Sequence, residues 1–332
     1  MPGTPFSVRF SVILLALSGF PTAFAFQAGP QKIFIEPRNR IASIAPVSAE
    51  TSAHLRVDAS LVLIPANVST DTGSRVGDLR KENFRLFEDG VEKPISHFTV
   101  EETPLSIGLL LDASGSMHNK MRQAGAAAAE FFKVTDPGDE FFLVEFSDRP
   151  KLTVPFTADT EEMQKKVART QPLGRTALLD AVQLALVQMK KARNTRKAIV
   201  ILSDGADNRS RSTFYQVKNA VIESGVQVYA MGIFDAIEGK KGTPEEQNGP
   251  KLLDELTEES GGEHFRANTP DELPGISARI SRELRSQYLI GYSPDDLASD
   301  GKYHRIKLQL VPPSHLPTLR VHYRPGFYAP GR

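Results

Sequence analysis

The sequence predicts an α/β fold with a doubly wound, mostly parallel sheet flanked by helices and framed by two β-rich segments. Over residues 104–285, apolar runs that suit buried strands alternate with longer segments that suit helices. Residues 51–103 and 286–332 instead show strand patterns separated by turn signals. The chain has 332 residues, which is enough for about two domains with a sizeable core.

The N-terminal β segment, residues 51–103, is expected to contain a strand and a hairpin. Residues 54–64 alternate as a strand does, and Pro65 lies just past its most apolar part. Residues 84–87 and 91–95 are two further apolar runs with an Asp-Gly pair between them. This arrangement is a strong signal for a β-hairpin.

The central segment, residues 104–285, is expected to alternate strands with helices. The expected strands are residues 105–111, 140–146, 151–156, 197–203, 226–233 and 263–266. The expected helices are residues 117–134, 160–169, 177–193, 214–224, 251–260 and 270–285. Strands 140–146 and 151–156 are too close for a parallel crossover, so we expect an antiparallel hairpin at a sheet edge. Gly225 occupies the position of a helix C-cap, and residues 235–250 are expected to form a polar loop.

The C-terminal β segment, residues 286–332, is expected to form strands at residues 287–292, 304–311 and 319–323. Neither terminal segment has enough strands to be comfortably stable alone, because an isolated hairpin is marginal in water. We therefore expect the two to pair into one small β-sandwich domain, with the α/β domain inserted between them. The alternative is two independent β appendages.

Composition excludes several kinds of site. The chain has no cysteine, which rules out disulfides, thiolate metal sites and cysteine nucleophiles. Lys and Arg together number 40, as do Asp and Glu, so the net charge is zero. No basic tract is present, and nucleic acid is not expected as a partner. The seven histidines show no metal-ligand spacing such as His-x-x-x-His.

The first 25 residues are typical of an export signal. Arg9 supplies a positive start, residues 10–17 are an apolar core, and Ala23-Phe24-Ala25 suits a cleavage site. Cleavage would leave residues 26–50, which show no periodicity, as an extended leader. The protein is thus expected to be secreted or periplasmic, with no membrane span after cleavage. A retained anchor is the alternative, but the apolar core falls short of the roughly 20 residues that span a bilayer.

Five oxygen-bearing side chains follow the ends of two apolar strands or lie in the loop between them: Asp112, Ser114, Ser116, Thr176 and Asp204. In doubly wound sheets, ligands bind beyond the carboxyl ends of the strands, where the strand order reverses. If the two strands are neighbours at that reversal, Asp112 and Asp204 converge on one crevice, which Thr176 could reach from the side. Hard oxygen ligands of this kind suit Mg²⁺, Mn²⁺ or Ca²⁺.

This pattern resembles the metal-ion-dependent adhesion site of von Willebrand factor type A domains. The resemblance covers about residues 104–285, and all five motif positions match in order. It implies that the three hydroxyls bind the ion directly and that the two carboxylates hold water or the ion. The flanking β segments are similar to those of bacterial secreted proteins that carry a von Willebrand A-related domain.

Structural roles stay open for some of these side chains. Ser114 or Ser116 could cap the helix expected from residue 117, and Thr176 could cap the helix expected from residue 177. Asp204 could belong to an ordinary Asp-Gly turn. Asp207 and Asn208 could line the crevice, but we expect them in a solvated loop.

The resemblance implies an exported binding module that captures a protein partner, whose Asp or Glu completes the shell of Mg²⁺, or of Mn²⁺ or Ca²⁺. The alternative is a scaffold or assembly factor of a cell-envelope complex. A metal-dependent hydrolase is a third hypothesis. The chain lacks Gly-x-Ser-x-Gly, a phosphate-binding loop and Gly-x-Gly-x-x-Gly, so we expect no enzyme and assign no catalytic residue.

Overall fold

The computed structural model describes residues 61–71, 73–234, 244–294, 300–311, 313 and 318–329. The expected signal and leader, and the first part of the strand expected at residues 54–64, lie outside these residues. Among the helices described, none is long and apolar enough to cross a membrane.

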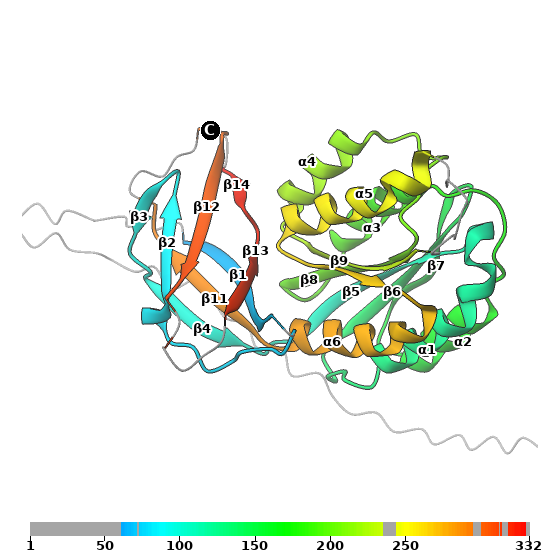
Figure 1. Cartoon of the computed structure of the whole chain (residues 1–332), viewed down its shortest axis with the longest axis horizontal. Coiled ribbons are helices and arrows are strands. Elements are labelled where there is room, and N and C mark those ends of the chain that lie inside the picture. Colours follow the sequence, from blue (N-terminus) through cyan, green and yellow to red (C-terminus); the bar gives the residue numbers. More distant parts are fainter. Residues whose placement is uncertain are drawn as a thin grey trace, which may run out of the picture. The chain divides into compact units, whose positions relative to one another are not determined.

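Six strands form the central sheet in the order β10-β9-β8-β5-β6-β7 (Figure 1). They are β5 (Leu105–Asp112), β6 (Glu140–Phe146), β7 (Pro150–Thr157), β8 (Arg196–Ser203), β9 (Gln227–Ile233) and β10 (His264–Ala267). All neighbours are parallel except β6 and β7, which form the expected antiparallel hairpin at the edge. The strand order reverses at β5, which lies between β6 and β8. The predicted doubly wound α/β fold is confirmed.

Helices cover both faces of this sheet (Figure 1). They are α1 (Met121–Phe131), α2 (Thr160–Arg169), α3 (Leu178–Met189), α4 (Phe214–Ser224), α5 (Pro244–Ser260) and α6 (Leu273–Arg285). Helices α1, α2 and α6 contribute to the hydrophobic cluster on one face, and α3, α4 and α5 to the cluster on the other. Gly225 ends α4 in the left-handed conformation, with φ of 64°, as the C-cap prediction requires.

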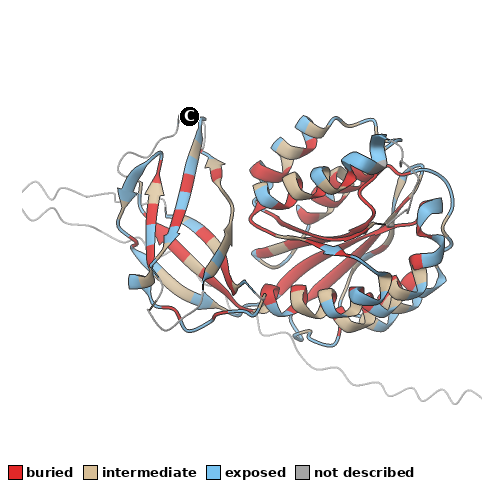
Figure 2. Cartoon of the chain, viewed as in Figure 1, coloured by how far each residue is buried: buried red, intermediate tan, exposed pale blue. Residues whose placement is uncertain are grey.

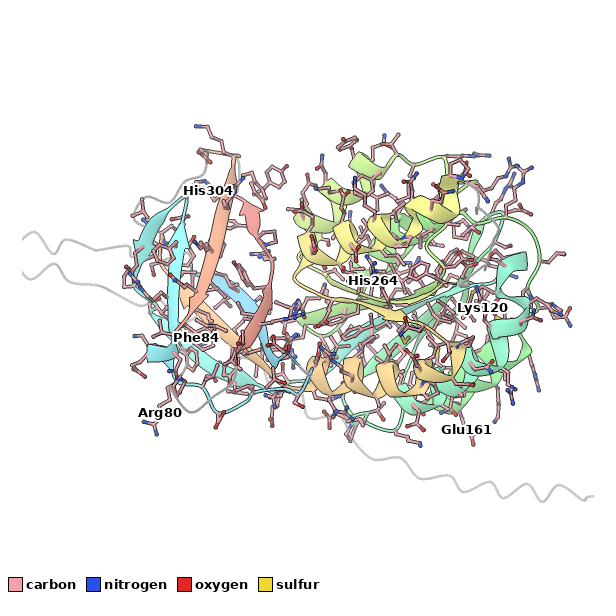
Figure 3. The ribbon with its side chains drawn as sticks, in the orientation of Figure 1. Arg80, Phe84, Lys120, Glu161, His264 and His304 are labelled. Carbon is pink, nitrogen blue, oxygen red and sulfur yellow. The ribbon has the colours of Figure 1, made fainter. Side chains whose placement is uncertain are left out.

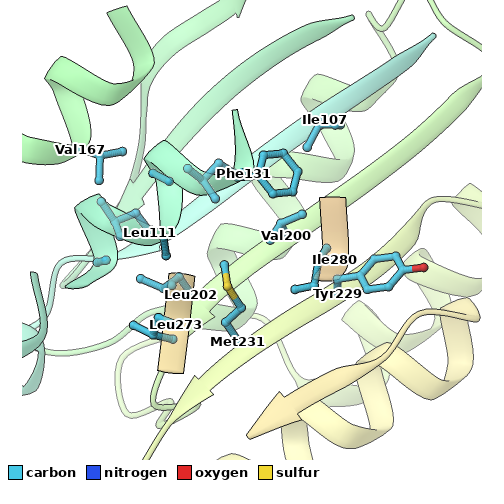
Figure 4. Close-up of a cluster of buried hydrophobic side chains, with 14 of the residues drawn as sticks. Ile107, Leu111, Phe131, Val167, Val200, Leu202, Tyr229, Met231, Leu273 and Ile280 are labelled. Atoms are coloured by element: carbon cyan, nitrogen blue, oxygen red, sulfur yellow. The ribbon is translucent and has the colours of Figure 1, made fainter. Parts of the chain in front are cut away.

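Strand β5 is the centre of the core. All eight of its residues are buried, as expected of a parallel strand covered by helices on both faces (Figure 2). On one face, Ile107 and Leu111 belong to the same cluster as Phe131 of α1 and Ile280 of α6 (Figure 4). Burying an aliphatic or aromatic side chain of this size stabilises the fold by about 1.5–3 kcal/mol.

The loop predicted over residues 235–250 is wrong from residue 244 onward, where helix α5 begins. The helix begins at Pro244 and continues through Gly249 and Pro250, where composition favours a loop. Proline suits the first turn of a helix, since its missing N–H has no partner there. The backbone of Gly249 lies against Gly205, where an added Cβ would come within 2.6 Å of the Gly249 carbonyl oxygen. This tertiary contact outweighs the low helix propensity of glycine.

The helix expected over residues 117–134 is divided in two. A 3₁₀ helix, η2, covers Gly115–Lys120, and α1 begins only at Met121. Lys120 is buried at this junction, and its ammonium group donates a hydrogen bond of 3.3 Å to the carbonyl of Ile233 (Figure 3). This contact holds the junction against the end of β9. Another 3₁₀ helix, η3 (Pro270–Glu272), precedes α6 in the same way.

Strands from both ends of the described chain share two further sheets, ordered β13-β1-β11-β4 and β14-β12-β2-β3. The strands are β1 (Val62–Thr70), β2 (Phe84–Glu88), β3 (Val91–Lys93), β4 (His97–Glu101), β11 (Gln287–Tyr292), β12 (Tyr303–Leu310), β13 (Leu319–Tyr323) and β14 (Gly326–Tyr328). Strand β1 pairs with β11, and β2 with β12. Ile64, Leu86, Tyr288 and Ile306, from both halves, lie in one hydrophobic cluster. The limits of the domains stay a prediction.

Two local features of this β unit bear on the sequence analysis. The Asp-Gly hairpin is present, since Asp89 and Gly90 have φ of 48° and 85° between the paired residues Glu88 and Val91. Strand β1, however, continues through Pro65 to Thr70, beyond its expected end. It pairs with β11 at residues 62–66 and with β13 at residues 66–70, so only one edge is paired near the proline. A strand tolerates proline where no ladder bond needs the missing N–H.

Replacing Gly108 tests the packing of β5. An added Cβ would lie 2.3 Å from the ring of Phe142, so we expect Gly108→Ala to lower the free energy of unfolding by about 1–3 kcal/mol. Gly125→Ala in α1 is the matched control. No atom lies within 4 Å of its added Cβ, and we expect a gain of about 0.5–1 kcal/mol. Urea unfolding followed by circular dichroism compares the two, and equal stabilities would contradict this packing.

His304 makes the stability of the β unit depend on pH (Figure 3). Its Nδ1 lies 2.9 Å from Asp89 and its Nε2 lies 3.4 Å from Asp300. Burial lowers the pKa of His304, but these two carboxylates outweigh that effect and hold it above the usual value. The imidazolium therefore stabilises the fold below the unfolded-state pKa of about 6.5, and this contribution is lost as the pH rises through the folded-state pKa.

We expect the parent to have a higher free energy of unfolding than His304→Gln at a pH of about 6. This difference should shrink as the pH rises to about 8. Urea unfolding at a series of pH values measures it. An advantage that stays constant or grows over this range would rule out the ion pairs of His304 as its source.

Candidate metal centre

The two predicted carboxylates lie beyond adjacent strands, at the point where the strand order reverses. Strands β5 and β8 are paired through Leu111 and Leu202, so Asp112 and Asp204 follow at the same edge of the sheet. The hydroxyl of Ser203 donates a hydrogen bond of 2.5 Å to Oδ2 of Asp112. Parallel pairing therefore joins the ends of two strands that are far apart in the sequence.

The loop that carries Thr176 is bonded to the loop after β5. The N–H of Leu173 donates to the carbonyl of Ala113 over 2.8 Å, and the N–H of Gly115 donates to the carbonyl of Gly174 over 3.1 Å. Thr176 is buried in the same loop. These two bonds keep the threonine loop beside the Asp-x-Ser-x-Ser loop.

The serines of the loop after β5 are arranged around Asp112 rather than around the helix that follows. The N–H of Ser114 donates to Oδ1 of Asp112 over 2.8 Å, and the hydroxyls of Ser114 and Ser116 are 3.1 Å apart. Ser114 stands at the N-cap of η2, yet its side chain makes no capping bond. Helix α3 has Ala177 at its N-cap, so Thr176 does not cap it either. These side chains therefore lack the capping roles that the sequence left open.

Charge and burial at this edge favour a cation. Asp112 is fully buried, and Asp204 is buried close to it. Burial, followed by the negative charge of Asp204, raises the pKa of Asp112 to about 7, although hydrogen bonds from Ser114 and Ser203 act in the opposite direction. A cation between the two carboxylates would offset both the burial and the repulsion. The chemistry of these side chains therefore fits a divalent ion.

The donor set is made of oxygens alone. Within the described residues, no group of three or more His, Cys, Asp or Glu side chains could hold a metal ion. The predicted site has two carboxylates and three hydroxyls, which is the oxygen chemistry that Mg²⁺, Mn²⁺ and Ca²⁺ prefer. The binding of an ion at this site would depend on the three hydroxyl groups as much as on the two negative charges.

The loop after β8 contains contacts that the sequence analysis missed. Asn208 accepts a hydrogen bond of 3.0 Å from the N–H of Thr176, and Asp207 accepts one of 2.8 Å from the N–H of Leu179. Asn208 is exposed and Asp207 is half-buried, as a solvated loop requires, but both side chains also tie this loop to the threonine loop and the start of α3. Asn and Asp often bond backbone groups in loops, which was the available signal. Ser203 was counted only as the end of a strand.

Part of the chain matches a known family of sequences. Residues 107–206 match the family model described as the von Willebrand factor type A domain. This part of the chain is thus similar to a von Willebrand factor type A domain. An uncharacterized protein of Borreliella burgdorferi is 28% identical over 144 residues, which is 39% of this chain and 42% of that protein. The chain thus spans less than half the length of this relative.

Several solved structures are similar to parts of this chain. A von Willebrand factor type A protein from Catenulispora acidiphila has a TM-score of 0.47 at 14% identity, covering 74% of this chain and 75% of its own. The von Willebrand domain of the type V pili tip protein Mfa5 from Porphyromonas gingivalis has a TM-score of 0.45 at 14% identity, covering 55% and 95%. An aerotolerance-related membrane protein from Bacteroides fragilis has a TM-score of 0.44 at 19% identity, covering 54% and 98%.

Removing the hydroxyl that holds Asp112 tests the arrangement of the site. We expect Ser203→Ala to weaken Mn²⁺ binding by about 10- to 100-fold, as is typical when a residue that orients a metal ligand is lost. Ser106→Ala is the matched control, since this buried serine bonds Glu140 at the other end of β5 over 2.6 Å. Titration calorimetry measures the affinities, and equal affinities in the two variants would contradict the role given to Ser203.

Proposed function

We propose that the von Willebrand A domain of this chain holds a divalent cation and captures a protein partner through it. The proposed ligands are Asp112, Ser114, Ser116, Thr176 and Asp204. The observation that carries the proposal is the convergence of two buried carboxylates at the reversal of the strand order, beside loops that bear hydroxyl groups. The match of residues 107–206 to the von Willebrand A family supports a protein-interaction module.

The chemistry of the ligands explains why a partner would be needed. Mg²⁺ takes six oxygens in near-octahedral geometry and usually keeps some water. Hydroxyl oxygens are neutral, so most of the negative charge at the site comes from Asp112 and Asp204. An Asp or Glu of the partner would replace a water and add charge where the protein supplies little. We propose Mg²⁺ as the ion, with Mn²⁺ or Ca²⁺ as substitutes.

The residues around the ion hold these ligands in place. Ser203 orients Asp112 through its hydroxyl, and Asn208 fixes the backbone of Thr176. We assign binding, and no catalytic step, to this arrangement. We also propose that the protein acts after export, and the pattern of residues 1–25 supports this.

Calorimetric titration of the protein with Mg²⁺ and Mn²⁺ tests the ion site. We expect one site per chain that is lost in Asp112→Ala and kept in Asp78→Ala, a control at an exposed aspartate outside the site. Thermal unfolding gives a second readout. Metal at a hundred times its dissociation constant should stabilise the parent by about 2.7 kcal/mol, and EDTA should reverse the effect. Undiminished metal binding by Asp112→Ala would contradict the proposal.

A further inference from the structure

Exposed basic side chains flank the loops of the metal centre. They are Arg149, Lys151, Arg169, Arg175, Arg209 and Arg211, and we call them the basic rim. With the rest of the described chain, these six side chains form no hydrogen bond and no ion pair within 4 Å. Cationic groups that have no partner in their own fold are available to an anionic ligand.

One side of the rim adjoins the metal loops through a hollow of about 500 Å³. Ala113 and Leu173, which are joined by a backbone hydrogen bond in the metal loops, contribute to its wall. Arg149, Lys151 and Arg169 line the same hollow. A group bound here would touch both the metal loops and three cationic side chains of the basic rim.

The other side of the rim lies along the loop after β8. A second hollow of about 550 Å³ is lined by Arg149, Arg209 and Arg211, together with Asn208. The N–H of Arg209 donates to the carbonyl of Thr176 over 3.0 Å, and Asn208 accepts from the N–H of the same threonine. Arg209 is therefore fixed, through its backbone, to a proposed metal ligand.

The carboxylates beside the rim are engaged by other groups. Asp148 accepts a hydrogen bond of 3.2 Å from the N–H of Arg175, and Asp180 accepts bonds from the N–H groups of Arg211 and Ser212. Glu145 accepts a hydrogen bond from the hydroxyl of Thr170. Backbone and hydroxyl donors thus hold these carboxylates, which keep their negative charge, and the guanidinium groups of the rim form no hydrogen bond with them.

We propose that the partner binds through an acidic segment of its chain. One carboxylate of this segment completes the shell of the ion, and its neighbours pair with the arginines of the basic rim. This inference rests on the proposed function and adds the charge of the partner to it. Arginine suits the task because its planar fork binds carboxylates through two parallel hydrogen bonds.

A protein segment fits this face better than a uniformly charged polymer. Leu173 is 79% exposed on the wall of the first hollow and offers an apolar contact that a peptide side chain can cover. Asp148 and Glu145 lie among the rim residues and would repel a continuous row of sulfate or phosphate groups. Separate carboxylates on a peptide can meet the arginines and avoid these two positions.

Two labelled peptides of equal length test the inference by fluorescence anisotropy. The acidic peptide has a central Asp flanked by Glu on both sides, and the neutral peptide has Gln in place of each Glu. With saturating Mg²⁺, we expect the acidic peptide to bind at least about tenfold more tightly, because several exposed ion pairs add up. Its advantage should shrink as salt is raised, since salt screens exposed charges.

Paired variants assign the effect to the rim. Arg209→Gln combined with Arg211→Gln should remove most of the advantage of the acidic peptide and leave Mg²⁺ affinity, measured by calorimetry, unchanged. Arg305→Gln combined with Lys307→Gln is the matched control, because it removes two exposed cations from β12 and should keep the advantage.

The outcomes separate the two proposals. If the parent binds no Mg²⁺, the proposed function fails and the acidic segment fails with it. If Mg²⁺ binds but the two peptides bind equally, or neither binds, only the acidic segment is overturned. Sulfated dextran that binds more tightly than the acidic peptide, and does so without Mg²⁺, would overturn it in favour of an anionic polysaccharide.

Discussion

The parallel pairing of β5 with β8 is the constraint on which the rest of the site depends. It brings Asp112 and Ser203 into contact and makes the crevice the place where the strand order reverses. A shift of one residue in this register would turn Asp112 away from its partners, because side chains alternate between the faces of a sheet. The buried residues of β5 hold the register, so the hydrophobic core and the polar site are stabilised by the same strand.

Burial of the two carboxylates links stability to function. Asp112 has a pKa of about 7 because the fold removes it from water beside Asp204. Such a pair is unfavourable without a counter-charge, and a divalent ion would provide one. Under our proposal, the cost of burying these groups is what makes the crevice selective for a cation. Because the hydroxyl ligands are neutral, the ion can still attract a carboxylate of the partner. The basic rim then attracts the acidic residues on either side of that carboxylate.

The sequence predicted the parts of the fold that depend on local patterns. Apolar runs identified β5 and β8, and the Asp-Gly signal identified the hairpin at Asp89. The start of α5 was missed because its glycine is held by a contact with the loop after β8. The roles of Ser203 and Asn208 were also missed, since they depend on loops that meet only in the folded chain. The five proposed ligands could be named from their motif, but their coordination of an ion stays a prediction.

The central claim is that one divalent ion is held where the loops after β5 and β8 meet the threonine loop. Diffraction from crystals grown with Mn²⁺, recorded for its anomalous signal, tests this claim most directly. The account predicts one strong anomalous peak per chain, with oxygens of Asp112, Ser114, Ser116, Thr176 or Asp204, or waters bonded to them, about 2.0–2.4 Å away. A fully occupied Mn²⁺ peak elsewhere and none at this position would contradict it.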